Sequence, residues 1–405
     1  MTRAEALRYH ERYGGKIEVN PKTRVRDSRD LSLAYTPGVA EPCLEIAKRP
    51  ADVYRYTSKG NMIAIMTDGT RVLGLGPIGP RAGLPVMEGK AVLFKKFAGV
   101  DAFPLCLDVK TPDEFVETAV RVEPAFGGIN LEDIATPHCF EIEARLKELL
   151  DIPVFHDDQH GTSIIALAGL LNALRLTQRR LEDSSFVING SGAAGIALAH
   201  FLRFAGAREI TMCDRAGLIY QGRTEHSNKY KDEVARFTNR AGRRGTLADA
   251  VKGADVLVGL SAPGTITPAM IRSMADGPIV FALANPEPEI APEAAIEAGA
   301  AVVATGRSDY ANQANNVLGF PGVFRGALDV RARRINEEMK LAAARAIASL
   351  IADAELSANY VIPSPIDPRV VPSVALAVAQ AAVDTGVARE PLDRERVLGH
   401  ITYGK

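Results

Sequence analysis

The sequence predicts an α/β protein with an N-terminal α/β domain, a second domain built on a doubly wound parallel sheet, and C-terminal helices. The chain has 405 residues, of which 47% are hydrophobic, so it can bury the cores of two or three domains. From residue 183 onward, short apolar runs alternate with helical segments, the pattern of a parallel sheet with crossover helices. A glycine-rich loop joins an apolar run to a helix in the same region. We expect domains at residues 1–160 and 161–388, with a tail at 389–405.

Composition and charge exclude several classes of protein. Lys and Arg number 48 against 49 Asp and Glu, so no basic surface indicates a nucleic acid or an anionic membrane as partner. The N-terminus is polar, and no run of apolar residues is long enough to span a bilayer. Four scattered cysteines are typical of reduced thiols. We therefore expect a cytoplasmic protein.

The first half is expected to mix short strands and helices. Apolar residues 62–67 and 71–74 flank Asp68-Gly69, which predicts a β-hairpin. The other N-terminal elements are expected to be strands at 101–108, 126–131 and 152–155, with helices at 90–97, 111–122, 140–150 and 163–176. The last of these helices should carry the chain into the second domain.

The second half has a regular alternation of elements. Strands are predicted at 185–189, 209–213, 256–260, 279–284 and 301–304. Helices between them are predicted at 194–205, 247–251, 268–275 and 292–298. Residues 323–354 are Ala-rich and helical in pattern, and a final helix is expected at 372–382.

A GxGxxG motif stands where a nucleotide-binding loop requires it. It follows the apolar strand at 185–189, opens a helix, and comprises Gly190, Ser191, Gly192, Ala193, Ala194 and Gly195. The first glycine makes the turn, the second admits the pyrophosphate, and the third allows the helix to pack on the strand. Asp214 ends the next strand, where it could accept hydrogen bonds from a ribose hydroxyl, and Arg215 follows it. This order predicts a Rossmann-type domain that binds NAD or NADP; the choice stays open, because Arg215 could offset the repulsion of a 2′-phosphate by Asp214.

A second GxGxxG match, at residues 74–79, has a different context. Pro77 removes a backbone N–H from this loop, and Pro80 follows it directly. The loop also follows the predicted hairpin rather than an isolated parallel strand. We interpret it as a structural or substrate-side loop.

Two pairs of acids follow predicted strands and precede predicted helices, namely Glu132-Asp133 and Asp157-Asp158. Either pair alone is more typical of a helix cap. Because the carboxyl ends of strands in an α/β fold converge on one crevice, the two pairs together favour a site for Mg²⁺ or Mn²⁺. Glu132 and Asp133 can share an ion only if the backbone bends between them.

Three further side chains are candidates for chemistry. Tyr35 lies in a turn rich in proline and glycine, and Arg71 beside the predicted hairpin could hold a carboxylate through two hydrogen bonds. Lys90 stands at the start of a predicted helix, where the helix N-terminus and a cation would favour its neutral form. On residue type alone, a structural interpretation is favoured for Tyr35 and Lys90, and for Arg71 it is as good as the functional one.

Several of these segments together resemble the malic enzymes. The matching stretches extend from about residue 16 to 387 and include LAYTPGVAEPCLEI, GKAVLFKKFAGVDAFP, FGGINLED, IPVFHDDQHGT, the GSGAAG loop, FALANPEPE, ATGRSDYANQANNVLGFPGVFRGALD and INEEMKLAAARAIA. One departure is Pro77, where many relatives carry Asn or Asp. The resemblance implies an N-terminal malic domain before the Rossmann-type domain, and oxidative decarboxylation of malate to pyruvate and CO₂ with reduction of NAD(P)⁺. It also implies a divalent metal ion, and a homodimer is the commonest closed assembly.

The resemblance also implies roles for individual residues. Tyr35 would be the general acid and Lys90 the general base, with Asp157 supporting Lys90 or the metal shell. The metal ligands would be Glu132, Asp133 and Asp158. Contacts to substrate carboxylates or the nicotinamide would come from Arg71, Asn285, Asn315 and Asn316.

Two other functions remain open on the sequence. A metal-independent 2-hydroxy-acid dehydrogenase would stay active in EDTA and release no CO₂. A non-enzymatic sensor of NAD(P)H would have no need of Tyr35 or Lys90 and would turn over no malate.

Overall fold

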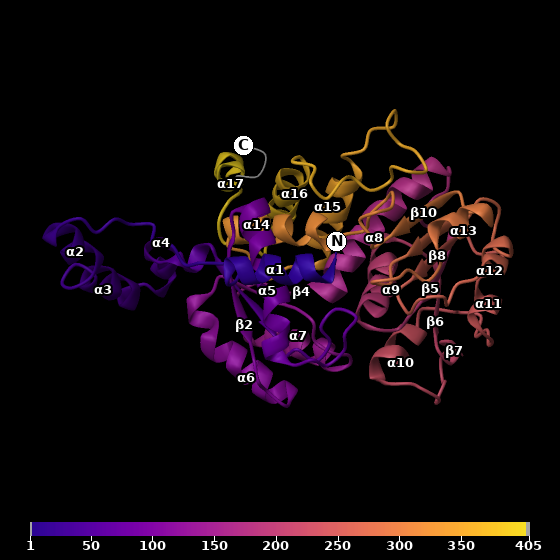
Figure 1. Ribbon diagram of the computed structural model, residues 1–405, viewed down its shortest axis with the longest axis horizontal. Helices are drawn as coiled ribbons and strands as arrows, with labels where there is room; N and C mark the ends of the chain where they lie inside the picture. Colours follow the sequence, from indigo (N-terminus) through magenta and orange to yellow (C-terminus); the bar gives the residue numbers. More distant parts are fainter. Residues whose placement is uncertain (1, 402–405) are drawn as a thin grey trace.

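The computed structural model describes residues 2–401 and has two parallel sheets, which confirms the predicted α/β class. Helix α8 (Asp157–Leu176) runs between the sheets in Figure 1. No helix in the described chain is long and apolar enough to cross a membrane. All four cysteines are free thiols.

The N-terminal sheet is parallel, with strand order β2-β1-β3-β4. Its strands are β1 (Met62–Thr67), β2 (Asp101–Cys106), β3 (Gly128–Leu131) and β4 (Val154–His156). The helical segments between them are α5 (Pro80–Ala98), α6 (Pro112–Val122), η3 (Glu123–Ala125) and α7 (His138–Leu149). Strand order reverses between β1 and β3, and ligands of open α/β sheets bind beyond the carboxyl ends of the strands at such a point.

The predicted hairpin at 62–74 is wrong. Strand β1 pairs in parallel with β2 and β3, and residues 71–74 form part of a loop. Gly69 has a φ of 68°, and its carbonyl accepts a hydrogen bond from Gly79 N–H at 3.0 Å. The turn at Asp68-Gly69 therefore closes the loop that leads to α5 rather than a hairpin, because both edges of β1 are already occupied.

The second sheet has six strands in the order β10-β9-β8-β5-β6-β7, all parallel except the short β7. The strands are β5 (Ser185–Asn189), β6 (Glu209–Asp214), β7 (Gly217–Leu218), β8 (Val256–Gly259), β9 (Ile279–Ala282) and β10 (Val302–Thr305). Its helices are α9 (Ala193–Ala205), α10 (Lys229–Ala235), α11 (Leu247–Ala250), α12 (Pro268–Arg272) and α13 (Pro292–Glu297). The reversal of strand order here lies between β5 and β8, beside the glycine loop.

The C-terminal segments return to the N-terminal sheet. They comprise η4 (Asn316–Leu318), α14 (Phe320–Asp329), α15 (Glu337–Ala348), α16 (Val370–Asp384) and α17 (Arg394–His400). The rings of Phe320 and Phe324 on α14 lie 4.7 and 5.3 Å from Phe94 on α5. One continuous apolar cluster contains residues of both sheets and of these helices, so the two sheets share a core.

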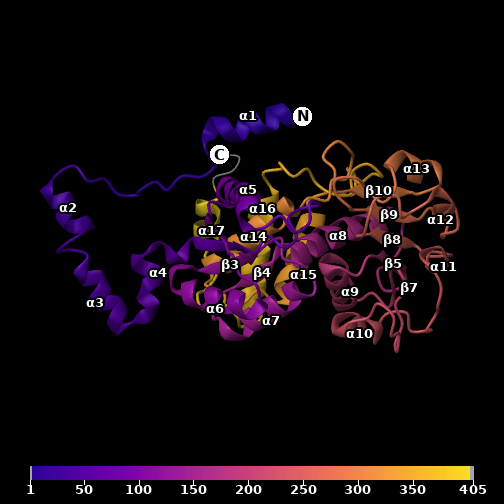
Figure 2. The same cartoon turned by 60° about the horizontal axis from the view of Figure 1, so that its bottom comes forward.

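Residues 18–57 form an arm that extends from the body. The arm carries α2 (Ser28–Ala34), α3 (Ala40–Lys48), η1 (Pro50–Asp52) and α4 (Val53–Tyr56), and none of these elements has a buried residue. Figures 1 and 2 show α2 and α3 away from both sheets, whereas α1 (Arg3–Tyr13), which precedes the arm, lies alongside the body; η2 (Ser58–Gly60) then leads into β1.

Candidate active site

A buried cluster of charges lies at the carboxyl edge of the N-terminal sheet. Lys90 Nζ is 2.6 Å from Asp157 Oδ2 and 2.9 Å from Glu132 Oε1. The lysine comes from α5, the aspartate from the first turn of α8 and the glutamate from the end of β3. The ammonium group of the lysine also lies over the ring of Phe320, with Nζ 4.2 Å from the ring centre, as a cation–π contact. A lysine held this way is oriented toward the crevice rather than toward solvent.

The backbone does bend at the first acid pair. Asp133 has a φ of 53°, so its side chain leaves the regular alternation of β3. Its Oδ1 accepts from Leu73 N–H at 3.1 Å, and its own N–H donates to Asp158 Oδ2 at 2.9 Å. The turn brings Glu132, Asp133 and Asp158 to one region, as sharing a ligand would require.

Burial and mutual repulsion disfavour the ionised forms of two of these acids. Burial raises the pKa of Glu132 to about 8, although Lys90 opposes the rise. Burial and the neighbouring Asp158 raise the pKa of Asp133 to about 7. Asp158 differs: burial would raise its pKa, but the hydrogen bond and charge of His156, the charge of Lys90 and the hydrogen bond from Asp133 N–H together lower it. Clustered carboxylates with raised pKa values gain most from an added cation.

The donor set fits a hard divalent cation. It consists of carboxylate oxygens, the ligands that Mg²⁺ and Mn²⁺ prefer, and Asp133 Oδ2 and Asp157 Oδ1 are buried without a hydrogen-bond partner. Within residues 2–401, no three His, Cys, Asp or Glu side chains already surround a common point as a metal cage would. The carboxylates that now face Lys90 would have to turn to receive an ion.

The expected placement of Lys90 at a helix start is wrong. Helix α5 begins at Pro80, so Lys90 lies in its middle, because the loop at 74–79 leads directly into the helix. Burial alone would lower the pKa of Lys90, but the carboxylates of Asp157 and Glu132 outweigh it and raise the pKa above its usual value. In this arrangement the lysine is an ammonium group.

The predicted substrate residues are placed unequally. Asn316 Nδ2 donates to Asp157 Oδ2 at 3.0 Å, so it belongs to the charge cluster. Arg71 is exposed and makes no ion pair within residues 2–401, and its Nη1 would lie 3.5 Å from a Cβ added to Gly192. Asn315 instead accepts from Val317 N–H as the cap of η4, and the exposed Asn285 packs against Gly306.

The glycine loop has the geometry that its sequence predicts. Gly190 has a φ of 128°, and a side chain there would strike Leu260 O; one at Gly195 would strike Gly190 O. Gly192 begins α9 and has open space beside it apart from Arg71. The loop can therefore admit a pyrophosphate at Gly192, directly beside the predicted substrate arginine.

Asp214 ends β6 as predicted but is not free. Its carboxylate accepts from Arg223 Nη2 at 2.5 Å and from Lys231 Nζ at 2.7 Å. Burial would raise the pKa of Asp214, yet these hydrogen bonds hold it at about 2. Arg215, expected to offset the charge of Asp214, is exposed and makes no ion pair in the described chain; Arg223 and Lys231 perform that neutralisation instead.

Tyr35 lies apart from this cluster within one chain. It follows α2 on the arm, is 69% exposed, and α2 lies far from α5 and β4 in both Figures 1 and 2.

Sequence reasoning missed four polar residues that organise the site. These are Arg223 and Lys231 at Asp214, Glu143 behind the turn at 156–160, and Glu289, which accepts from Ser261 N–H and Ala284 N–H beside the nucleotide crevice. Only Glu143 left a signal in the sequence, because it interrupts the apolar face of α7 between Phe140 and Leu146.

Both parts of the chain match models of known families. Residues 14–113 and 110–147 match the malic enzyme N-terminal domain, and residues 159–383 match the malic enzyme NAD-binding domain. The chain is 60% identical over 395 residues to the bifunctional malic/malolactic enzyme of Bacillus subtilis, covering 98% of this chain and 96% of that protein. It is 58% identical over 377 residues to the NAD-dependent malic enzyme of Geobacillus stearothermophilus (93% and 78%) and 52% identical over 407 residues to the NADP-dependent malic enzyme of Halomonas elongata (96% and 95%).

The fold also matches a solved structure. The crystal structure of a malic enzyme from Pyrococcus horikoshii superposes with a TM-score of 0.95 at 50% sequence identity, covering 99% of this chain and 95% of that one.

Proposed function

Because this chain is a member of the malic enzyme family, we propose that it oxidises and decarboxylates (S)-malate to pyruvate and CO₂ while reducing NAD⁺ or NADP⁺. One observation carries the proposal beyond the similarity. The Lys90–Asp157–Glu132 cluster lies at a sheet edge that is joined to the nucleotide loop through Arg71 and Gly192. A hydroxy acid held by Arg71 would therefore lie between a proton acceptor and a nicotinamide.

We propose that Lys90 accepts the proton of the malate C2 hydroxyl while hydride passes from C2 to the nicotinamide. Asp157, which contacts both Lys90 and Asn316, keeps the lysine aimed at that hydroxyl. When bound by Glu132, Asp133 and Asp158, a Mg²⁺ or Mn²⁺ ion would polarise the C2 oxygen and stabilise the charge released as CO₂ leaves. Drawing Glu132 away from Lys90 would also lower the pKa of the lysine toward the range a base needs.

We propose that Tyr35 supplies the proton to C3 and does so in the partner subunit of a homodimer. Three features support this assignment: Tyr35 is exposed on the arm, the arm has no buried residue in its helices, and its exposed side chains include Leu31, Leu33 and Leu44. An apolar arm of this kind is stabilised when a second copy covers it.

Mixing two inactive variants tests the shared site. Tyr35→Phe and Lys90→Met chains are each expected to be inactive. If Tyr35 serves the partner, a mixed dimer holds one intact site; half of randomly exchanged dimers are mixed, so activity should recover to about a quarter of wild type. If Tyr35 serves its own chain, the mixture stays inactive.

A malate assay with NAD⁺ and NADP⁺, with and without Mn²⁺, tests the reaction itself. We expect pyruvate in proportion to reduced nucleotide, and loss of turnover in EDTA. Oxidation of malate in EDTA without CO₂ would indicate a metal-independent dehydrogenase, and absence of turnover with both nucleotides would indicate a sensor of NAD(P)H.

A further inference from the structure

The turn that carries Asp157 and Asp158 is supported from behind by one buried carboxylate. Glu143 on α7 is 5% exposed, and its oxygens are met by three donors from residues 156–160. His156 N–H lies at 3.2 Å, Gln159 Nε2 at 3.1 Å, and His160 Nε2 at 2.8 and 3.0 Å. A buried carboxylate is retained only where donors compensate its desolvation, and Lys147 Nζ, 2.8 Å from Glu143 Oε1, adds an ion pair to these three.

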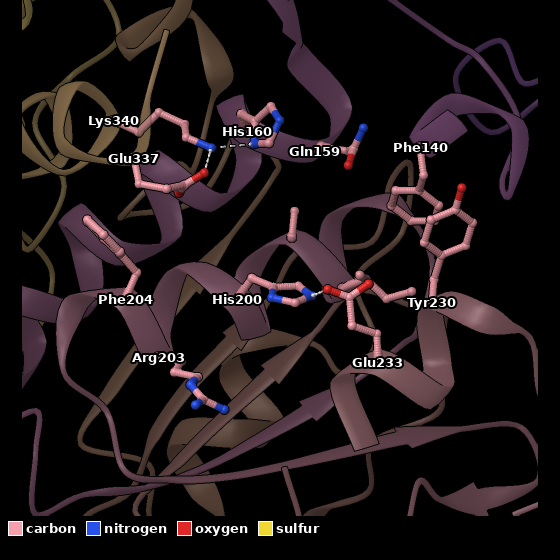
Figure 3. A pocket seen from close by; sticks show the side chains of 12 residues that line it. Phe140, Gln159, His160, His200, Arg203, Phe204, Tyr230, Glu233, Glu337 and Lys340 are labelled. Carbon is pink, nitrogen blue, oxygen red and sulfur yellow. Dashed lines mark hydrogen bonds and ion pairs between the residues drawn. The ribbon is translucent and has the colours of Figure 1, made fainter. Parts of the chain in front are cut away.

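The direction of the hydrogen bond between His160 and Glu143 is fixed by Lys340 on α15. Lys340 Nζ lies 3.1 Å from His160 Nδ1, and it also contacts Glu337 on its own helix; Figure 3 shows all three side chains at the edge of a cavity. An ammonium group has only donors, so Nδ1 of His160 is the acceptor and Nε2 carries the proton that is donated to Glu143.

The same argument continues to the proposed metal ligand. Gln159 Nε2 donates to Glu143 Oε2, and it also lies 2.8 Å from His156 Nδ1. His156 Nε2 donates to Asp158 Oδ2 at 3.1 Å, because an ionised carboxylate has only acceptors. Glu143 orients the amide of Gln159, the amide contacts Nδ1 of His156, and the imidazole holds one oxygen of Asp158.

We infer that Glu143 is a positioning residue, which sets the orientation of Asp158 for divalent-metal binding through Gln159 and His156. The inference rests on the proposed function, because the role of Asp158 as a metal ligand is part of that proposal. Residues that orient metal ligands through hydrogen bonds commonly change metal affinity by about 10- to 100-fold when they are replaced. Glu143 itself touches neither the metal ligands nor the nucleotide loop.

Mn²⁺ binding to the purified protein tests this role directly. The variant Glu143→Gln keeps the size of the side chain but presents an amide that can no longer accept from all three donors. Free Mn²⁺ is measured by electron paramagnetic resonance, without substrate or nucleotide. We expect the Mn²⁺ dissociation constant to rise about 10-fold or more, and saturating Mn²⁺ to restore most of kcat.

A matched control and a second variant complete the experiment. Glu141→Gln changes a half-exposed acid on the same helix, one that pairs with Arg145, and should bind Mn²⁺ as wild type does. If Glu143→Gln does not fold, Gln159→Leu, which removes the same link, should weaken Mn²⁺ binding in the same direction. A lowered Tm with unchanged Mn²⁺ affinity in the folded variants would show a purely structural role and overturn the inference. A wild-type protein that neither binds Mn²⁺ nor turns over malate would overturn the proposed function as well.

Discussion

Replacing Lys90 by Met removes the only cation between two buried acids, and the structure gives this change a definite size. The side chains of Lys90, Asp157 and Glu132 are 10%, 1% and 8% exposed. Removing one member of a buried ion pair costs about 3–5 kcal/mol, because the remaining charge is uncompensated. Glu132, with a pKa of about 8, can take up a proton, so we expect the lower end of this range. Methionine is an unbranched apolar side chain of similar length, so it can fill the space beside Phe320, but it removes the cation–π contact of Lys90 Nζ with that ring.

The expected losses in stability and rate can be separated. At about 1.2 °C per kcal/mol for a chain of this length, 3 kcal/mol lowers the Tm of the metal-free protein by about 3.5 °C. Loss of a general base lowers kcat by about 10²- to 10⁴-fold, or roughly 3–5 kcal/mol of barrier. Mn²⁺ should bind at least as tightly as in wild type, because the acids have lost a competing cation.

Differential scanning fluorimetry and malate turnover, each with and without Mn²⁺, measure these effects. Lys95→Met is the matched control, because Lys95 lies on the same helix in an exposed ion pair with Asp101. A Lys90→Met protein that retains wild-type kcat would remove Lys90 from the chemistry. An unchanged metal-free Tm would refute the charge argument.

Three further outcomes follow from the geometry. Lys231→Gln removes one cation from Asp214, whose charge should then repel a 2′-phosphate. The ratio of kcat/KM for NADP⁺ to kcat/KM for NAD⁺ should fall by about tenfold, or 1.4 kcal/mol. An unchanged ratio, measured with both nucleotides, would show that Lys231 does not contribute to the choice of nucleotide. Gly192→Ala should fold normally yet weaken nucleotide binding measured by calorimetry. In Gly195→Ala the added methyl group would strike the backbone oxygen of Gly190, so this variant should have a lower Tm. A lower Tm for Gly192→Ala, together with an unchanged Tm for Gly195→Ala, would contradict the assignment of the loop. Burial would raise the pKa of Asp329, but its basic neighbours lower it, so the stability it contributes is complete above about pH 4 and is lost as the pH falls through its folded-state pKa. In urea unfolding, Asp329→Asn should reduce the fall in the free energy of unfolding that wild type shows below about pH 4. The same dependence on pH in both proteins would exclude Asp329 as its source.

The parts of the fold that depend on local pattern were predictable. The strand, glycine loop and helix at 185–205 follow from residues close in sequence, because the motif is local and a side chain at Gly195 would strike Gly190 O within the same loop. The demand at Gly190 comes instead from Leu260 O, which is distant in sequence. The predicted hairpin was wrong because the pairing of β1 depends on residues that are distant in sequence. Asp68-Gly69 is a good local turn, but the partners of β1 come from residues 101–106 and 128–131, and no short-range signal records them.

The site shows the same division. The acids at 132, 133 and 158 were located because strand ends converge, but the bend at Asp133 and the placement of Lys90 in the middle of α5 depend on tertiary contacts. The bond from Glu143 to His160 joins separate helices, and the sequence shows only a charged residue on an apolar face. Tyr35 is visible in the sequence, whereas its separation from the cluster within one chain is visible only in three dimensions.

The most direct test of the central claim follows the carbon that leaves. (S)-malate labelled with ¹³C at C4 is incubated with the wild-type protein, Mn²⁺ and the better of the two nucleotides, and labelled CO₂ and reduced nucleotide are counted together. We predict one labelled CO₂ for each reduced nucleotide, unlabelled pyruvate as the other product, and neither product in EDTA. Reduced nucleotide formed while the label stays in a four-carbon acid would contradict the assignment.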